Sequence, residues 1–380
     1  MIGHPRRSCD NRSPGGSTKY DCFHLVLMVT HDCNLRCDYC YTGAKSPRSM
    51  SLELGQRSIE RAVKSVHPGG TLELGFFGGE PLLEAGLIAE LIDYAQSQAD
   101  AAEVMLRPGL TTNGTVRSMA AWDVMMRPEL DLCVSCDGLP NVHDRHRRAA
   151  DGRGSAERVL GTIRRLLEID RDFLGMMVIR PDTVPHLPAS IDWLRGQGVL
   201  RIDLTLDVWA VWESGDVEHL EEALIAVADI WREGLPDGAI NWFDEKAAHL
   251  ARLPMNRSAR CGFGDGEIAV APSGNLYPCE RLIGEDQPGH PMRLPGHALD
   301  GSDFCRSSMP GRSDPACSPC AIASHCNTTC RCNNYVRTGD ITRPDALLCL
   351  LERVCCRETA RVLGELSPTN EQMVSMEESV

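Results

Sequence analysis

The sequence lacks the features that would place the protein in a membrane, outside the cell or on nucleic acid. No apolar run approaches the roughly 18–20 residues that a membrane-spanning helix needs. No secretory hydrophobic segment opens the chain, and we see no room for a separate peptide-recognition domain before the first predicted strand. Basic side chains are scarce, with 39 Lys and Arg against 53 Asp and Glu and a net charge of −14, which argues against a nucleic-acid partner. We therefore expect a cytoplasmic protein with no membrane contact.

Cysteine, in contrast, is abundant, with 18 in 380 residues. The cysteines are clustered rather than spread as a disulfide ladder, which favours metal centres in a reducing compartment. The hydrophobic fraction of 42% is typical of a globular chain, and the length allows two domains or one barrel with an appendage. Cys9 and Cys22 stand apart near the start, and we interpret them as uninvolved thiols.

The tightest group is Cys33, Cys37 and Cys40, spaced C-x3-C-x2-C after an apolar, β-rich run. Three thiols this close fit neither a helix face nor a strand face, so they suit a loop around a metal centre. Thiolates select zinc, copper(I) or iron–sulfur clusters. An iron–sulfur cube normally takes four cysteines, so a group of three leaves one iron open for a substrate or cofactor. A zinc loop or ordinary buried thiols are the alternatives.

Short apolar runs alternate with helical patterns through the first half of the chain. Helices are expected after Ser51, from Leu83, and over 155–169 and 188–197. The predicted strands are 23–30, 71–77, 104–112, 130–135, 173–179 and 201–208. This alternation predicts parallel strands with right-handed crossovers and with the chemistry at their C-terminal ends. By itself it fits a partial (β/α)6 barrel and an open doubly wound sheet equally well.

Polar motifs follow three of these strands. They are Gly78-Gly79-Glu80-Pro81 after the second strand, Thr112-Asn113-Gly114 after the third and Ser135-Cys136-Asp137-Gly138 after the fourth. Paired glycines let the backbone approach a ligand closely, and the glutamate supplies an acceptor. A hydroxyl and a carboxylate two residues apart leave the same side of a strand and suit a ribose diol. Each motif has an ordinary turn as its alternative, and we interpret Cys133 and Cys136 as core thiols on opposite strand faces.

A second cysteine field follows residue 260. It contains Cys261, Cys279, Cys317, Cys320, Cys326, Cys330 and Cys349. Seven thiols supply most of two four-thiolate clusters, and a turn-rich segment of this size needs such staples. A zinc ribbon would account for four of them. The aromatic residues that concentrate ahead of this field either pack between domains or line a peptide cleft: Trp209, Trp212, Trp231, Trp242 and Phe243.

The first motif, with an aromatic residue before its last cysteine, resembles the signature of the radical S-adenosylmethionine (SAM) enzymes. The resemblance implies a partial (β/α)6 barrel and a [4Fe–4S] cluster on Cys33, Cys37 and Cys40, whose open iron holds SAM. Cleavage of SAM then gives a 5′-deoxyadenosyl radical that abstracts a substrate hydrogen. The residues implied to bind SAM are Tyr39, Gly78, Gly79, Glu80, Pro81, Asn113, Ser135, Asp137 and Arg147. For Arg147 a solvated charge is the alternative, and we expect His143 and His146 at the surface.

The second field resembles the SPASM extension of these enzymes. The resemblance implies one auxiliary [4Fe–4S] cluster on Cys317, Cys320, Cys326 and Cys349, and another on Cys261, Cys279 and Cys330. The anaerobic sulfatase-maturating relatives carry a further cysteine shortly before the place of Cys261, whereas 256–260 supplies none. The cluster on Cys279 is therefore expected to keep an open iron or to borrow a thiol. The candidates for that thiol are Cys22, Cys305 and Cys332.

Glu280 lies where the sulfatase-maturating relatives keep an Asp that is thought to take a proton from the substrate. The resemblance therefore implies a catalytic base at Glu280, with a surface acid as the alternative. The predicted boundaries are 1–20 for a flexible lead-in, 21–210 for the barrel, 211–260 for a helical bridge, 261–356 for the SPASM domain and 357–380 for a tail that starts helical and ends disordered.

The predicted function is a radical SAM/SPASM maturase. It would oxidise a ribosomally synthesised precursor peptide, forming a thioether or another crosslink, with a reducing partner such as flavodoxin or ferredoxin. The alternatives are an anaerobic sulfatase-maturating enzyme that makes formylglycine from Cys or Ser, a maturase of a small molecule or carrier, and a non-enzymatic protein with structural zinc.

Overall fold

A single curved sheet organises the computed structural model of the chain, which describes residues 19–251, 262–305, 317–323, 325–326 and 330–366. Within these residues the sheet has ten strands in the order β10-β9-β8-β1-β2-β3-β4-β5-β6-β7. The strands are β1 (Tyr20–Thr30), β2 (Val66–Gly78), β3 (Met105–Thr112), β4 (Asp131–Ser135), β5 (Leu174–Ile179), β6 (Arg201–Leu206), β7 (Ala239–Ile240), β8 (Glu267–Val270), β9 (Asn275–Tyr277) and β10 (Leu294–His297). All six predicted strands are present, with boundaries shifted by a few residues.

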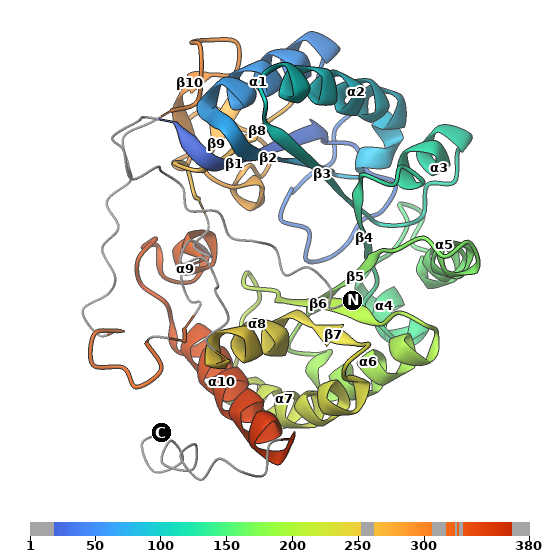
Figure 1. The fold of residues 1–380 in the computed structure, drawn as a ribbon. Coiled ribbons are helices and arrows are strands. Elements are labelled where there is room, and N and C mark those ends of the chain that lie inside the picture. The colour runs from blue at the N-terminus through green and yellow to red at the C-terminus, as the bar shows by residue number, and fades with distance from the viewer. Residues whose placement is uncertain (1–18, 252–261, 306–316, 324, 327–329, 367–380) are drawn as a thin grey trace.

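The strand order decides between the two architectures that the sequence left open. Strands β1 to β7 follow one another across the sheet in chain order, and each neighbouring pair is parallel. In a doubly wound sheet the order of the strands reverses at a switch point, and the strand order does not reverse along β1–β7. The strands instead turn progressively with the helices outside them, as Figure 1 shows, which is the geometry of a partial barrel.

Some of the helices begin at side-chain caps. The helices are α1 (Leu52–Ser65), α2 (Ala85–Ala101), α3 (Met119–Met125), α4 (Pro140–His146), α5 (Ala156–Glu168), α6 (Leu187–Gly196), α7 (Ser214–Gly234), α8 (Asn241–Leu250), α9 (Arg331–Thr338) and α10 (Ala346–Leu366), with short 3-10 turns at η1 (Pro81–Glu84), η2 (Val184–His186) and η3 (Glu280–Leu282). Ser51 caps α1 as predicted, because its side chain accepts a hydrogen bond from the Leu54 amide. The helix expected from Leu83 starts later, since η1 occupies the residues before Ala85.

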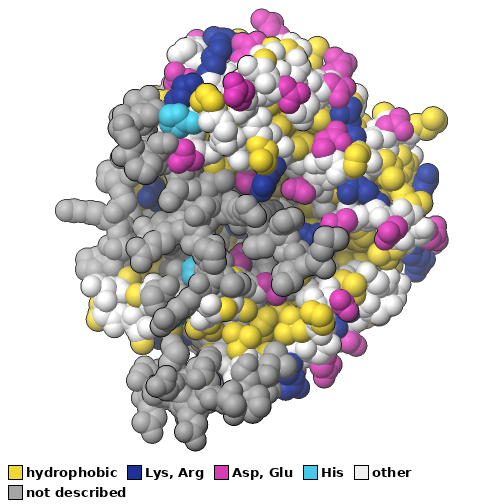
Figure 2. All heavy atoms as spheres, in the orientation of Figure 1, with side chains coloured by type: hydrophobic (Ala, Val, Ile, Leu, Met, Phe, Trp, Pro, Cys, Tyr) yellow, Lys and Arg dark blue, Asp and Glu magenta, His cyan; other side chains and the backbone are white. Residues whose placement is uncertain are grey.

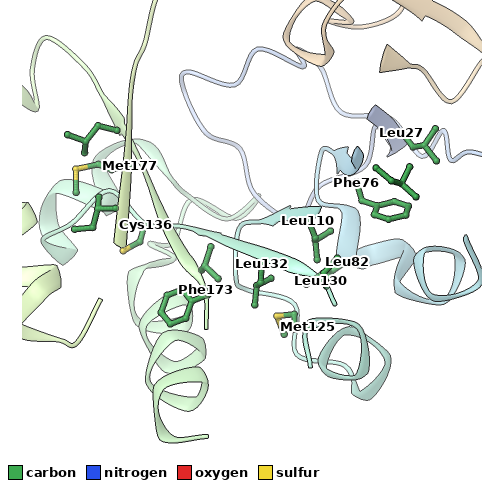
Figure 3. Close-up of a cluster of buried hydrophobic side chains, with 14 of the residues drawn as sticks. Leu27, Phe76, Leu82, Leu110, Met125, Leu130, Leu132, Cys136, Phe173 and Met177 are labelled. Carbon is green, nitrogen blue, oxygen red and sulfur yellow. The ribbon is translucent and has the colours of Figure 1, made fainter. Parts of the chain in front are cut away.

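The main core lies between the sheet and the outer helices. Apolar side chains from successive strands meet there, as Figure 3 shows for Leu27, Phe76, Leu110 and Leu132. Trp231 and Phe243 belong to this core, with their rings stacked 5.6 Å apart. Of the aromatic cluster that precedes the second cysteine field, these two residues therefore pack rather than line a cleft.

The second cysteine field joins the same sheet, which the sequence did not suggest. Strand β8 pairs in parallel with β1, and β8, β9 and β10 continue as antiparallel neighbours. The segment predicted as the SPASM domain therefore contributes strands to the same sheet as the barrel. The predicted tail begins inside α10, and 367–380 lies outside the described residues.

On the surface, acidic and basic side chains are interspersed over the described part of the face in Figure 2. Among the described residues, none of the helices is both long enough and apolar enough to cross a membrane.

Arg61 connects the second field to the barrel. This α1 residue is 6% exposed, and its guanidinium donates to the carbonyls of His297, Ala298 and Asp303 at 2.7–3.3 Å. The same group lies 4.0 Å from the centre of the Phe304 ring. A buried cation that satisfies three carbonyls holds the 297–304 segment against α1.

We predict that Arg61→Met lowers the free energy of unfolding by about 2–4 kcal/mol, because buried carbonyls lose their donors. Thermal unfolding under anaerobic conditions measures this loss. Lys64→Met is the control on the same helix: Lys64 is an exposed basic residue of α1, and its loss should cost less than about 1 kcal/mol. Equal effects of the two substitutions would contradict the assignment.

Candidate active site

The cysteine loop starts where β1 ends and is held by the segment that follows α4. Leu35 forms a bridge with Ala149, and the Arg36 amide donates to the Arg148 carbonyl at 2.6 Å. The Asp38 amide donates to the carbonyl of His146 at 3.1 Å. Two parts of the chain more than a hundred residues apart thus form one short antiparallel pair. This pairing fixes the loop at the C-terminal edge of the sheet, where a barrel places its chemistry.

The three loop thiols are close enough to influence one another and carry no disulfide. Burial raises the pKa of Cys37 to about 12, and the neighbouring Cys40 and Cys33 add to this shift. At Cys40 burial is outweighed by the Lys45 ammonium, which donates to Sγ at 2.8 Å, so the pKa of this thiol is lowered. Lys45 thereby favours the thiolate form that iron or zinc requires. Three free thiols in one loop fit a soft metal centre.

The two glycines after β2 bring that strand end against the entrance of the cysteine loop. The Gly79 amide donates to the Thr30 carbonyl at 2.8 Å, and the Glu80 amide donates to the Asp32 carbonyl at 2.8 Å. A Cβ atom on Gly79 would lie 2.2 Å from the Asp32 carbonyl oxygen, and one on Gly78 would lie 2.6 Å from that of Thr30. In this structure the close approach predicted for these glycines is therefore made to the chain's own backbone.

Glu80 ties the end of β2 to the end of β3. Its buried carboxylate accepts from the Thr112 hydroxyl at 2.7 Å, the Asn113 amide at 2.7 Å and the Leu82 amide at 3.0 Å. Burial raises the pKa of Glu80, and these hydrogen bonds oppose the shift. Pro81 is buried at the first position of η1. The T-N-G motif predicted to lie beside the cysteine loop is thus placed there by the G-G-E-P motif.

Asn113 connects the end of β3 to the cysteine loop. Its side-chain nitrogen donates to the Asn34 side-chain oxygen at 2.9 Å and lies 3.7 Å from Cys33 Sγ. Its side-chain oxygen accepts from the Thr115 amide at 2.9 Å. Asn113 is 7% exposed, so the amide is held rigidly at the base of the first cysteine.

Asp137, Tyr39 and Arg147 meet beside the same loop. The Tyr39 hydroxyl donates to Asp137 Oδ2 at 2.5 Å, and Arg147 Nε lies 3.6 Å from the same oxygen. The Arg147 guanidinium is 5.6 Å from the Tyr39 ring centre. Arg147 is 6% exposed, so it is not the solvated charge that we weighed as its alternative. Its Nε is buried with no hydrogen-bond partner, which leaves a donor available for an anionic group. Ser135, at the end of β4, is also buried.

His143 is a positioning residue that we expected at the surface. It is fully buried, and burial lowers its pKa to about 4, so the ring is neutral near pH 7. The Asp137 amide donates to Nδ1 at 3.2 Å, so Nε2 carries the proton and faces the Ser155 hydroxyl at 2.9 Å. Ser155 in turn donates to the Arg147 carbonyl at 2.6 Å. These three hydrogen bonds fix the backbone of both Asp137 and Arg147. His143 lies in a helix of seven residues, which is too short to give a periodic signal in the sequence.

Glu280 lies inside a small group of ionisable side chains. Carboxylate oxygens of Glu280 and Glu267 and the Cys279 sulfur lie within 4.8 Å of one another. Burial raises the pKa of Glu280, and the charge of Glu267 adds to the shift. His24 faces Glu267 across the β1–β8 register, with Nδ1 3.9 Å from a carboxylate oxygen. Glu280 is half-buried in this group, unlike the surface acid that we weighed as its alternative.

An aromatic stack joins the cysteine loop to the second field. The rings of Tyr41 and Trp209 stack at 5.8 Å, and the Arg281 guanidinium lies 4.9 Å from the centre of the Trp209 ring. Trp209 is 42% exposed, so part of its side chain is accessible to solvent. Arg281 follows Glu280 directly, which places the acid beside the stack.

The predicted ligands of the second field fall into two groups among the described residues. The charges of Cys317 and Cys320 act on Cys349, and those of Cys320 and Cys326 act on Cys356. Cys279 and Cys330 lie apart from them in an apolar cluster around Phe263. Cys261 lies outside the described residues.

Comparison with known proteins now identifies the chemistry of the cysteine loop. Residues 27–194 match the model of the radical SAM superfamily. The protein is a radical SAM enzyme. Its fold implies SAM and a [4Fe–4S] cluster as cofactors. The alternative of a non-enzymatic structural zinc protein is thereby set aside.

Three relatives in sequence share part or most of the radical SAM enzyme's length. A cysteine-type anaerobic sulfatase-maturating enzyme of Clostridium novyi is 23% identical over 334 residues, covering 81% of this chain and 87% of that protein. The radical SAM cyclopropyl synthase TigE of Paramaledivibacter caminithermalis is 22% identical over 353 residues, covering 88% and 73%. An uncharacterised protein of Methanocaldococcus jannaschii is 26% identical over 183 residues, covering 48% of this chain and 62% of that protein.

Two solved structures share the fold. One is anSMEcpe with bound AdoMet, with a TM-score of 0.75, 16% identity and coverage of 93% of this chain and 97% of that chain. The other is Streptococcus suis SuiB bound to the precursor peptide SuiA, with a TM-score of 0.59, 14% identity and coverage of 86% and 75%. The fold match thus extends from the radical SAM domain through most of the chain.

We predict that Gly79→Ala reduces the iron bound at Cys33, Cys37 and Cys40, because the new Cβ displaces the backbone that enters the loop. Iron content and the visible absorption of anaerobically reconstituted protein measure the loss. Gly86→Ala on α2 is the control: its Cβ meets no atom within 4 Å, and a helical alanine stabilises by about 1 kcal/mol. Full cluster loading of Gly79→Ala would contradict the prediction.

Proposed function

We propose that this enzyme is a SPASM-type maturase that oxidises a ribosomally synthesised precursor peptide. The proposal depends on one observation, the position of Glu280 between the cysteine loop and the second cysteine field. The charge of Glu280 acts on Tyr41 of the cysteine loop. Cys279 of the second field directly precedes Glu280 and hydrogen-bonds to its carboxylate. A substrate group at Glu280 would therefore lie between the centre that activates SAM and the centres that accept electrons.

Residues of the radical SAM domain would hold the first cluster and SAM. Cys33, Cys37 and Cys40 would bind the cluster, and the unpartnered donor of Arg147 fits the SAM carboxylate. Asp137 and Ser135 would contact the ribose, with Tyr39 fixing the Asp137 carboxylate. The remaining SAM contacts in the proposal are Gly78, Gly79, Glu80, Pro81 and Asn113. Since Glu80 already accepts three hydrogen bonds, its contribution to the SAM amino group would use a remaining lone pair.

The second field would hold two auxiliary [4Fe–4S] clusters. Their proposed ligands are Cys317, Cys320, Cys326 and Cys349 for one, and Cys261, Cys279 and Cys330 for the other. The separation of these thiols into two groups supports this assignment. When bound, the first cluster with SAM supplies hydrogen abstraction from an unactivated carbon, and the auxiliary clusters supply an acceptor for the electrons of a net oxidation.

Glu280 would take the proton that a net oxidation releases from the substrate. A general base must be ionised and must reach the reacting group. His24 opposes the raised pKa of Glu280, which favours the ionised form, while Glu267 keeps the carboxylate basic. The exposed face of Trp209 offers an apolar surface for the neighbouring peptide residues.

A precursor peptide is favoured over a sulfatase by two features. The SuiB structure contains a precursor peptide on the same fold. This chain also lacks a cysteine in 256–260 and has Glu280 where the sulfatase-maturating relatives have Asp. Sulfatase maturation stays as the second candidate, because the Clostridium novyi relative covers 81% of the chain.

Incubation with peptides distinguishes the two candidates. The enzyme, SAM and a reductant such as flavodoxin or dithionite are combined anaerobically with a precursor peptide encoded near the gene or with a sulfatase peptide. We expect the precursor peptide to lose two hydrogens by mass spectrometry, with release of 5′-deoxyadenosine. Formylglycine in the sulfatase peptide, with the precursor unchanged, would overturn the proposal in favour of the second candidate.

We predict that Glu280→Gln lowers product formation by roughly 10²-fold or more, the usual range for a general base, while cluster content stays unchanged. Peptide turnover and iron analysis on the same preparation measure the two quantities. Glu218→Gln, at an exposed position of α7, is the control and should retain full activity. Unimpaired turnover by Glu280→Gln would remove the proposed base.

A further inference from the structure

The auxiliary centre proposed at Cys279 has one ligand too few. Its assigned thiols are Cys261, Cys279 and Cys330, and 256–260 adds none. A [4Fe–4S] cube normally takes four cysteines. The sequence alone offered three replacements without ranking them: Cys22, Cys305 and Cys332.

The structure separates these three candidates. Cys22 is disulfide-bonded in the structure, whereas Cys305 and Cys332 are free thiols. Cys305 packs against the main core beside Phe304, and its amide is held by Asp303. Cys332 alone among the three belongs to the buried cluster that contains Cys279 and Cys330.

Cys332 contacts both assigned ligands. Its sulfur lies 3.3 Å from Cys330 Sγ and shares a hydrogen bond with Cys279. The side chain is 3% exposed, and Cys330 and Cys332 are free thiols rather than a disulfide. Rotation about χ1 moves either sulfur, so the two thiols can bind different irons of one centre.

A positive charge lies beside Cys332. Arg281 Nη1 lies 3.9 Å from Cys332 Sγ, and it is fixed by a 2.6 Å hydrogen bond to the Asn333 side chain. The charges of Cys332, Cys330 and Cys279 all act on this guanidinium. Cys330 caps α9 and Cys332 lies in its first turn, where the helix N-terminus favours anions. A buried group of thiolates needs such compensation.

We propose that Cys332 is the fourth thiolate of the auxiliary iron–sulfur centre held by Cys279 and Cys330. This inference rests on the auxiliary centre of the proposed function. With four thiolates the centre has no open iron, so a substrate thiol does not bind there. The centre then acts in electron transfer only, and the substrate is held by Glu280 and the Tyr41–Trp209 stack.

The test counts auxiliary iron in the full-length chain without SAM or peptide. The background variant carries Cys33→Ala, Cys37→Ala and Cys40→Ala, which removes the first cluster. After anaerobic reconstitution this background should hold about eight irons, four for each auxiliary cube. Adding Cys332→Ala should leave one iron of that cube without a thiolate, which should lower the count below about eight and shift one component of the electron paramagnetic resonance spectrum of the reduced protein.

Two further variants make the result specific. Cys305→Ala is the matched control and should retain the iron and the spectrum of the background. Cys332→Ser keeps the side-chain size and offers an oxygen ligand, so it should shift the resonance while circular dichroism stays unchanged. This variant carries the test if Cys332→Ala does not fold.

The inference is overturned if Cys332→Ala and Cys332→Ser both leave the iron content and the spectrum of the background intact. A Cys330–Cys332 disulfide in the reconstituted protein, detected by mass spectrometry, would also overturn it. A background with far fewer than about eight irons, whatever residue stands at 332, would instead disprove the auxiliary centres of the proposed function itself.

Discussion

The contact on which the site depends is the close approach of the β2 end to the chain that leaves β1. At Gly79 the two backbones pass so near each other that no side chain fits between them. This approach lets the Gly79 and Glu80 amides satisfy the carbonyls of Thr30 and Asp32, which would otherwise be left without partners at the strand end. The cysteine loop therefore leaves the sheet in one direction only. Glu80 also fixes the end of β3, because its carboxylate accepts hydrogen bonds from Thr112 and Asn113.

A second constraint is the buried charge beside that loop. Arg147 is almost completely removed from water, and removing an arginine from water costs several kcal/mol unless partners compensate. Asp137 and the Tyr39 ring provide part of this compensation, and the Nε donor makes no hydrogen bond. His143 and Ser155 stabilise the arrangement from behind by binding the backbone. A fold tolerates such a group where function uses it, and our proposal assigns this donor to the SAM carboxylate.

The barrel strands could be predicted from the sequence because each is a short apolar run that ends in a turn motif. Parallel strands covered on both faces read as such apolar runs, and the motifs at their ends indicated the position of the site. Strand β8 could not be predicted, since its four residues begin with Glu267 and carry no alternation. Its place beside β1 is set by pairing with a distant strand.

The ligands and charges of the site were only partly visible in the sequence. Spacing identified Cys33, Cys37 and Cys40, because ligands of one loop must be close in sequence. Spacing could not show that Arg147 is buried or that Cys332 joins Cys279, because both depend on how α4 and α9 pack against the rest of the chain. His143 was misjudged for the same reason: its partners lie on other segments, and its own helix has seven residues.

The pairing of β8 with β1 has a consequence for electron movement. Strand β8 is hydrogen-bonded to β1, the strand that leads into Cys33, along the register from His24 to Leu27, and β9, which leads into Cys279, pairs with β8. The two cysteine fields are thus parts of one rigid body rather than modules on a hinge. Tunnelling between redox centres falls steeply with separation, so under the proposed function the shared sheet would keep the distance between the first cluster and the Cys279 centre constant.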